Sequence, residues 1–224
     1  MTTVAQIVVA IASLGMADVA AAAVGAQVQG GTLGLGATIA IPVSKTVTAR
    51  IGYTAYSMSR TVDDTSATYD GTLQLGNVLG LLDWHPGGHS FKVSTGLVAT
   101  GNKIDVTGTP VGGSYRIGGA TYSSAQVSSV QGSIKVGNGT APYVGLGFGN
   151  PLGEGSRLSF LFDLGVILTG SPNVSLTATC APTLSAATCN QVQQSVATEI
   201  NELRNSATEL KVWPVINIGL GWRF

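Results

Sequence analysis

Residues 158–168 read LSFLFDLGVIL, and this stretch decides the fold. Large apolar side chains occupy every second position from Leu158 to Leu168, and the positions between them include Ser159, Asp163 and Gly165. This strict alternation is the period of a β-strand. A strand of about ten residues can cross a lipid bilayer when it is tilted.

Six further segments share this period of two, and we expect each to be a strand. They are residues 32–41, 47–56, 72–84, 91–97, 144–149 and 216–224. In 72–84 the apolar face is expected to carry four leucines: Leu73, Leu75, Leu79 and Leu81. The alternation slips at Asp83 and Trp84, which predicts a β-bulge there.

The composition of the 224 residues excludes several protein classes. Eleven basic residues balance eleven acidic ones, charged residues make up only 10% of the chain, and glycine occurs 31 times. The mean hydropathy of +0.34 is too high for a disordered chain. The balanced charge predicts no nucleic-acid partner, and two cysteines are too few for a disulfide scaffold. No apolar run of about 20 residues follows residue 30, so membrane-spanning helices are not expected either.

The second face of the strands indicates which solvent surrounds them. It carries mostly Gly, Ser and Thr, with isolated charges of both signs, namely Arg50, Asp83, Lys92, Asp163 and Arg223. Such a face suits the lumen of a narrow barrel, and the aliphatic face would then contact lipid. We therefore predict an all-β fold, a transmembrane up-and-down antiparallel barrel. The five charges either pair as a plug that closes the lumen or line a pore.

Connections of two kinds support a barrel. The turns at 42–45 and 85–89 and the glycine-rich stretch at 150–155 are short, whereas 61–68, 103–127 and 171–210 are longer and polar. Outer-membrane barrels combine short periplasmic turns with long outer loops. Because such barrels have an even number of strands, we expect eight. The eighth is either residues 127–136, with a hairpin turn at 137–140, or a segment before Gly30.

The amino terminus is interpreted as an export signal. Residues 4–14 (VAQIVVAIASL) have the length of a signal-peptide apolar region, and small residues precede a cleavage site after Ala26. The predicted organisation is a signal peptide over 1–26 and one barrel domain over 27–224. No Lys or Arg occurs before Lys45, so the signal is weak or the true start lies upstream. A buried apolar helix is the alternative.

The carboxyl end, INIGLGWRF at residues 216–224, resembles the last strand of small bacterial outer-membrane β-barrels of the OmpA/OmpX/OmpW-like class. In that class the terminal aromatic closes the barrel and is recognised by the assembly machinery. The resemblance implies that Trp222 and Phe224 form an assembly signal. It also implies an outer-membrane location, with membrane lipid and the barrel-assembly machinery as partners. Any other ligand stays unknown.

The longest loop is expected to contain a helix and a disulfide. Apolar residues follow helical spacing over 190–211, with Asn190 as a candidate N-cap. This helix packs on its own loop, or else it forms a gate or a partner-binding surface. Cys180 and Cys189 are nine positions apart in that loop, and export through an oxidising periplasm favours a bond between them.

The sequence contains weak signals for chemistry. His85 and His89 flank a Pro-Gly-Gly turn, which we interpret as a solvated turn, and no metal site or other cofactor is predicted. No GxSxG or HExxH motif is present, so we do not expect an enzyme. The favoured function is a structural or surface-interaction role in the cell envelope. The alternatives are a narrow, porin-like channel for small or apolar solutes and, less favoured, a membrane-embedded enzyme.

Overall fold

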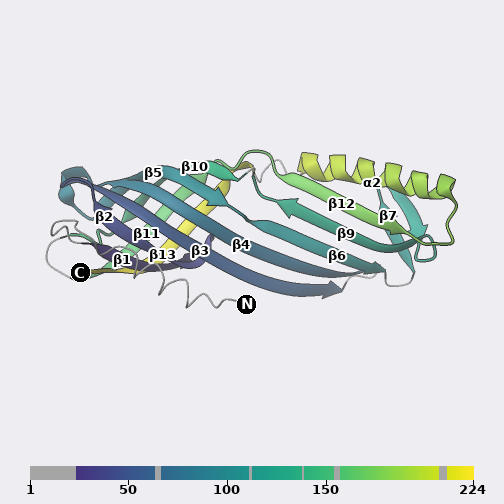
Figure 1. The fold of residues 1–224 in the computed structure, drawn as a ribbon, viewed down its shortest axis with the longest axis horizontal. Helices are drawn as coiled ribbons and strands as arrows, with labels where there is room; N and C mark the ends of the chain where they lie inside the picture. Colours follow the sequence, from purple (N-terminus) through teal and green to yellow (C-terminus); the bar gives the residue numbers. More distant parts are fainter. Residues whose placement is uncertain (1–23, 64–66, 111–112, 138, 154–156, 207–210) are drawn as a thin grey trace, which may run out of the picture.

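Eight antiparallel strands form a closed ring (Figure 1). The computed structural model describes residues 24–63, 67–110, 113–137, 139–153, 157–206 and 211–224. The ring strands are β1 (Gly25–Gly31), β2 (Gly34–Pro42), β3 (Val47–Asp63), β4 (Ala67–Trp84), β5 (Phe91–Thr100), β10 (Thr140–Phe148), β11 (Leu158–Ile167) and β13 (Trp213–Arg223). Each pairs with the next, and pairing of β1 with β13 closes the ring. The predicted antiparallel barrel is confirmed.

The eighth strand of the ring is β1, the segment before Gly30 that one of the two sequence alternatives required. The other alternative is wrong, because residues 127–135 form a strand that lies outside the ring and pairs with β6 and β12. The sequence places the same alternating pattern in both segments, so the period alone does not distinguish a ring strand from one beside it.

The two ends of the ring differ in the length of their connections. At the end that carries Phe224, which we term the inner end, β2–β3, β4–β5 and β10–β11 are joined by short segments, one of which holds the 3₁₀ turn η1 (Pro86–Gly88). At the opposite, outer end β1 and β2 join tightly, but the β5–β10 and β11–β13 connections are long insertions. This asymmetry matches the short and long connections that the sequence predicts.

The insertions are not polar loops, as the sequence suggested, but a second folded unit that we term the extension. Its sheet consists of β6 (Lys103–Pro110), β9 (Val127–Lys135) and β12 (Asn173–Cys180), and it continues from the outer half of β4. A hairpin of β7 (Ser114–Ile117) and β8 (Ala120–Ser123) and the helix α2 (Ala186–Ser206) complete it. In Figure 1 the helix lies along β12, beyond the ring.

The extension has its own apolar core, separate from the lumen of the ring. Val192 and Val196 of α2 are buried against Tyr115, Tyr122 and Ala178. The helix therefore packs on its own insertion, as one of the two interpretations of the sequence expected.

The helix begins earlier than the sequence indicated. Ser185, not Asn190, caps it, because the Ser185 hydroxyl accepts a hydrogen bond from the Thr188 amide at 3.2 Å. The expected continuation to residue 211 lies partly outside the described residues, which leave out 207–210.

One strand face was predicted wrongly. Leu79 and Leu81 of β4 point into the ring and are buried, whereas Val78 and Leu82 are about half exposed on the outside. Asp83 is in phase with Leu79 and Leu81, and the pairing of β3 with β4 runs without a shift from one end to the other. The predicted bulge at Asp83 and Trp84 is therefore absent. The bulge was inferred from leucines assigned to the lipid face, but these leucines lie on the same inward face as Asp83.

Residues 1–23 lie outside the described part of the chain, so the predicted signal peptide stays a prediction. The first described strand begins at Gly25, and its Ala26 pairs with Trp222. Among the described helices, none combines the length and the apolar character needed to cross a membrane.

Candidate functional site: the closed lumen

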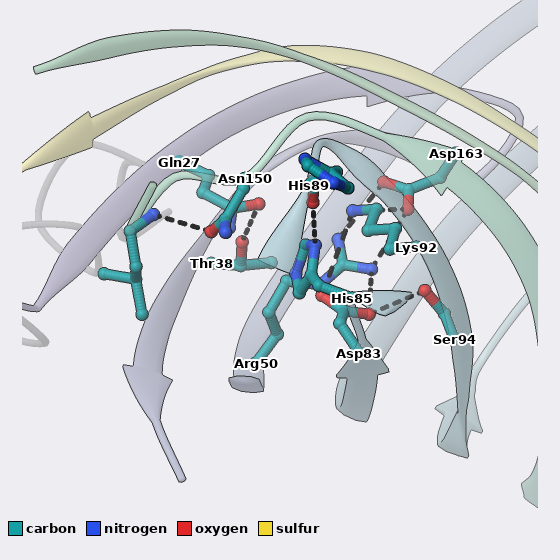
Figure 2. Close-up of polar contacts among 11 residues, drawn as sticks. Gln27, Thr38, Arg50, Asp83, His85, His89, Lys92, Ser94, Asn150 and Asp163 are labelled. Carbon is teal, nitrogen blue, oxygen red and sulfur yellow. Dashed lines mark hydrogen bonds and ion pairs between the residues drawn. The ribbon is translucent and has the colours of Figure 1, made fainter. Parts of the chain in front are cut away.

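The inner half of the lumen is occupied by charged side chains from four strands. Arg50 comes from β3, Asp83 from β4, Lys92 from β5 and Asp163 from β11, and each is at most 4% exposed. Alternation places all four on the inward face of their strands. Figure 2 shows the four side chains converging on one another.

These four residues form one ion-pair network, the lumen network. Arg50 donates to both carboxylate oxygens of Asp163, at 3.1 Å from Nη1 and 3.0 Å from Nη2, and to Asp83 Oδ1 at 2.9 Å. Lys92 Nζ lies 2.8 Å from Asp163 Oδ1, and Ser94 donates to Asp83 at 2.6 Å. Because β3 and β11 lie on opposite sides of the ring, the bond between Arg50 and Asp163 crosses the lumen.

A glycine leaves the space that the network needs. Gly147 of β10 lies between Lys92 and Asp163 in the strand register. A Cβ atom at Gly147 would lie 2.5 Å from Lys92 Cε and 3.0 Å from Asp163 Oδ1. Small residues on the inward face therefore allow two long cations to fit inside a ring of only eight strands.

An apolar layer closes the outer half of the lumen. It consists of Leu33, Leu79, Leu81, Val98, Ala141, Tyr143, Ile167 and Val215. The cavity that remains between this layer and the lumen network has a volume of about 10 Å³. That is room for about one water molecule, so the lumen network and the apolar layer leave little free space between them.

The sequence predicted the charged part of this site but not its apolar part. It named Arg50, Asp83, Lys92 and Asp163, which the structure brings together. Arg223 lies apart, near the inner end, where its guanidinium donates to the Gly153 carbonyl at 2.9 Å. The apolar layer was missed because its leucines on β4 were assigned to the lipid face. Asp83 lies an even number of residues from these leucines, which indicates that they share its inward face.

The histidine turn closes the inner end. His89 is exposed, as expected of a solvated turn, but His85 is 1% exposed. A ring nitrogen of His85 lies 3.1 Å from the His89 carbonyl oxygen. Burial lowers the pKa of His85, which disfavours a further positive charge near Arg50 and Lys92. No group of three or more metal-binding side chains was found among the described residues.

The outside of the ring is apolar. Exposed aliphatic and aromatic side chains cover every ring strand, for example Val28, Leu35, Ile51, Leu82, Leu97, Leu146, Leu164 and Ile218. Trp222 and Phe224, the predicted assembly signal, are part of this exposed surface. A contiguous apolar surface around a whole ring is far larger than soluble monomers expose.

The polarity of both faces inverts halfway along β3 and β4. On the outward face the apolar Ile51 and Val78 give way to Ser59 and Thr72, whose hydroxyls lie 3.0 Å apart. On the other face the buried charges give way to larger, partly exposed side chains, among them the 38% exposed Met58 and the exposed Arg60. The change occurs at the paired residues Ser57 and Gln74.

The cysteines are joined. Cys180 at the end of β12 and Cys189 in α2 form a disulfide. The bond fastens the start of the helix to the sheet that it covers.

No protein-family model and no curated protein sequence matches the chain. Among solved structures, Acinetobacter baumannii CarO2 is 21% identical with a TM-score of 0.57, covering 90% of this chain and 98% of that one. CarO of the same organism is 22% identical with a TM-score of 0.55, covering 89% and 97%. A major outer membrane protein from Thermus thermophilus aligns at 14% identity and a TM-score of 0.40, covering 91% and 100%.

The narrower resemblance to the OmpA/OmpX/OmpW-like class stays a prediction, since none of these structures carries such a name. At 21–22% identity, the two first likenesses bear on the fold alone. The chain therefore shares its fold with the CarO proteins.

Proposed function

We propose that the chain is an integral β-barrel of a bacterial outer membrane, with a structural or surface-interaction role and no open pore. The apolar belt supports membrane insertion, because every outward strand face of the ring is suited to hydrocarbon. The short connections at the inner end and the long insertions at the outer end agree with the periplasmic and external sides of such barrels. In this orientation the extension faces the outside of the cell.

The closed lumen is the observation that carries the proposal. An ion must shed most of its water to pass a space that holds about one water molecule. It would also have to break the bond between Arg50 and Asp163 and then cross an apolar layer. The ring therefore serves as an anchor, and the extension supplies the surface that other molecules meet. This proposal gives the chain no catalytic role.

Conductance in planar lipid bilayers tests the proposal. The purified full chain, shown to be folded by heat-modifiable migration on gels, is expected to give no conductance steps. Leu79→Ser/Leu81→Ser is the comparison variant, because it makes the apolar layer wettable and leaves the lumen network in place. Stable conductance steps from the unmodified chain would contradict the anchor role.

A narrow gated channel is the second candidate, and the apolar layer is what favours it. Apolar constrictions can gate a pore by excluding water. Under this alternative, Leu79→Ser/Leu81→Ser raises a conductance that the unmodified chain already has at a low level. Under the anchor role, the variant stays closed because the lumen network still blocks the lumen.

The end of β13 is proposed as the assembly signal. Phe224 is 78% exposed and extends the apolar outward face of the strand. A chain that ends at Arg223 is expected to accumulate in the periplasm and to be degraded there. Normal yield of the shortened chain in the outer membrane would remove this role from Phe224.

A further inference from the structure

The extension and the ring separate at a fork in β4, and a cavity lies at that fork. The inner half of β4 pairs with β5, and its outer half pairs with β6. The cavity between the two branches has a volume of about 560 Å³, which is within the range of small-ligand sites. The polar side chains of its lining include Lys103, Lys135, Asn102 and Asn173.

The two lysines give the cavity an unbalanced positive charge. Lys103 of β6 and Lys135 of β9 are direct partners in the strand register. Like charges in this position repel each other and destabilise a sheet. Asp105 lies 2.9 Å from Lys103 and balances one of the charges. Within the described part of the chain Lys135 forms no ion pair of its own and only shares the attraction of the Asp105 carboxylate, so two cations face one anion.

A buried amide adds a donor to the same lining. Asn102 is 2% exposed, and its Oδ1 accepts a hydrogen bond from the Gly76 amide at 3.1 Å. Its main-chain carbonyl accepts one from Val136 at 2.9 Å. Its Nδ2, however, has no partner among the described residues. A buried donor without a partner costs free energy. This nitrogen is shielded from solvent, so an acceptor in the cavity would reach it only after a shift of the Asn102 side chain.

The cavity lies at the level where the apolar belt ends. Strand register connects Ser57, Gln74, Lys103, Lys135 and Asn173 in one row across five strands. This is the row at which the outward face of β3 and β4 changes from apolar to polar. If the belt is embedded in lipid, as proposed above, the row lies at the height of the lipid headgroups.

We propose that this cavity binds a phosphate group of a lipid headgroup in the outer leaflet. Lysine ammonium groups and an amide N–H are donors suited to the oxygens of a phosphate. The side chains present more donors than acceptors, which disfavours a cation. The position next to the belt favours a phosphate carried by a lipid over one from bulk water. The lipid assignment rests on the proposed membrane insertion, whereas the anion site does not.

Titration of the full chain in uncharged detergent tests the site. The probes are inorganic phosphate, dihexanoyl phosphatidic acid and the uncharged dihexanoyl glycerol, and binding is measured by calorimetry. The test variant is Lys103→Gln/Lys135→Gln. The control is Lys45→Gln/Arg157→Gln, which removes the same charge from two exposed positions at the inner end. Because both are assayed in detergent, a failure of membrane insertion does not affect the result.

The expected result is that phosphatidic acid binds and the uncharged lipid does not. The test variant should bind it at least about tenfold more weakly, which is the size of one lost charge-assisted hydrogen bond. The control should bind it normally. Without ligand, Lys135→Gln alone should be no less stable than the unmodified chain, since it relieves repulsion. A purely structural lysine would instead destabilise the sheet when replaced.

Three outcomes would overturn parts of the inference. Equal binding by the test variant and the unmodified chain would remove the site. Equal weakening by the control would show general charge attraction in place of a site. Binding of inorganic phosphate as tight as that of phosphatidic acid would retain the anion site and overturn its assignment to a lipid.

Discussion

The inner and outer halves of the β3–β4 hairpin are built on one uninterrupted ladder of seventeen residue pairs, yet their polarities are opposite. In the inner half, apolar side chains such as Leu82 point outward and charges such as Arg50 are buried inside. In the outer half, Thr61 donates to Asp70 on the outward face, and the partly exposed Met58 lies on the opposite face. Both halves share the same regular strand pairing. They differ in their surroundings, because the outward face of the inner half is suited to lipid and that of the outer half to water.

The largest expected effect comes from the buried network of the inner half. Asp163→Asn leaves Arg50 and Lys92 with a single carboxylate in a closed lumen, which should cost about 3–5 kcal/mol of unfolding free energy. Asp70→Asn is the control in the outer half, where an exposed polar group contributes below about 1 kcal/mol. Urea unfolding in lipid vesicles measures both. Similar costs for the two variants would mean that the lumen is hydrated and the comparison is wrong.

The next effect concerns the outward face. Val78→Arg places a charge near the middle of the apolar belt and should cost about 2–4 kcal/mol. Thr72→Arg, on the same face of the same strand but beyond the change in polarity, should cost about 0–1 kcal/mol. Vesicle refolding followed by tryptophan fluorescence gives both values. If Thr72→Arg were as costly as Val78→Arg, the lipid boundary would have to lie further out than Ser57 and Gln74.

The disulfide tests whether the outer unit is stabilised independently. Cys180→Ser/Cys189→Ser should lower the free energy of local unfolding of this insertion by about 2–3 kcal/mol, because the bond restricts the unfolded chain. The loss of protease resistance should be confined to roughly residues 171–210. The ring should remain folded because the bond lies outside it. Thiol alkylation of the unreduced, unmodified protein should label neither cysteine. Collapse of the whole ring in the double variant would show that the two regions fold as one.

The smallest effect is a pH dependence in the extension. Hydrogen bonds from Lys103 and Ser133 lower the pKa of the Asp105 carboxyl below its ordinary value. Because the pKa of Asp105 is lower in the folded state than in the unfolded state, the ionised carboxylate stabilises the fold at pH values above the unfolded-state pKa. This stabilisation is lost as the pH falls through the folded-state pKa. The carboxyl is partly exposed, so the change should be below about 1 kcal/mol. Amide hydrogen exchange in β6 and β9 below about pH 4 should show it, and Asp105→Asn should abolish it.

The sequence predicted the ring well where one face of a strand is clearly apolar. Residues 158–168 and 216–224 have such faces, and both strands lie in the ring as expected. It failed on β4, because Leu81 and Leu82 are adjacent and an apolar pattern then fits either face. Only the charge of Asp83, which must lie inside, determines which face is the lumen. A buried charge is in this respect a better indicator of direction than four leucines.

The extension was the larger omission. Its strands alternate Ile104 and Val106 with Asp105 and Thr107, which is the same period as in the ring. The sequence contains no sign that these residues leave the ring, because that depends on β4 changing partners at the fork. The lumen network was predictable from its charges and from the small residues around them. The pairing of each cation with a particular carboxylate depends on the stagger between strands. A single sequence does not reveal this stagger.

The shared β4 strand has a mechanical consequence. A pull on the extension along the strand direction would be carried by β3 and β4 directly into the ring. Ladder hydrogen bonds lie across the strands, so such a load shears many of them at once instead of opening them one by one. A force applied by a molecule bound to the extension would therefore act on the whole barrel. The force that the hairpin withstands would increase with the number of hydrogen bonds in its ladder.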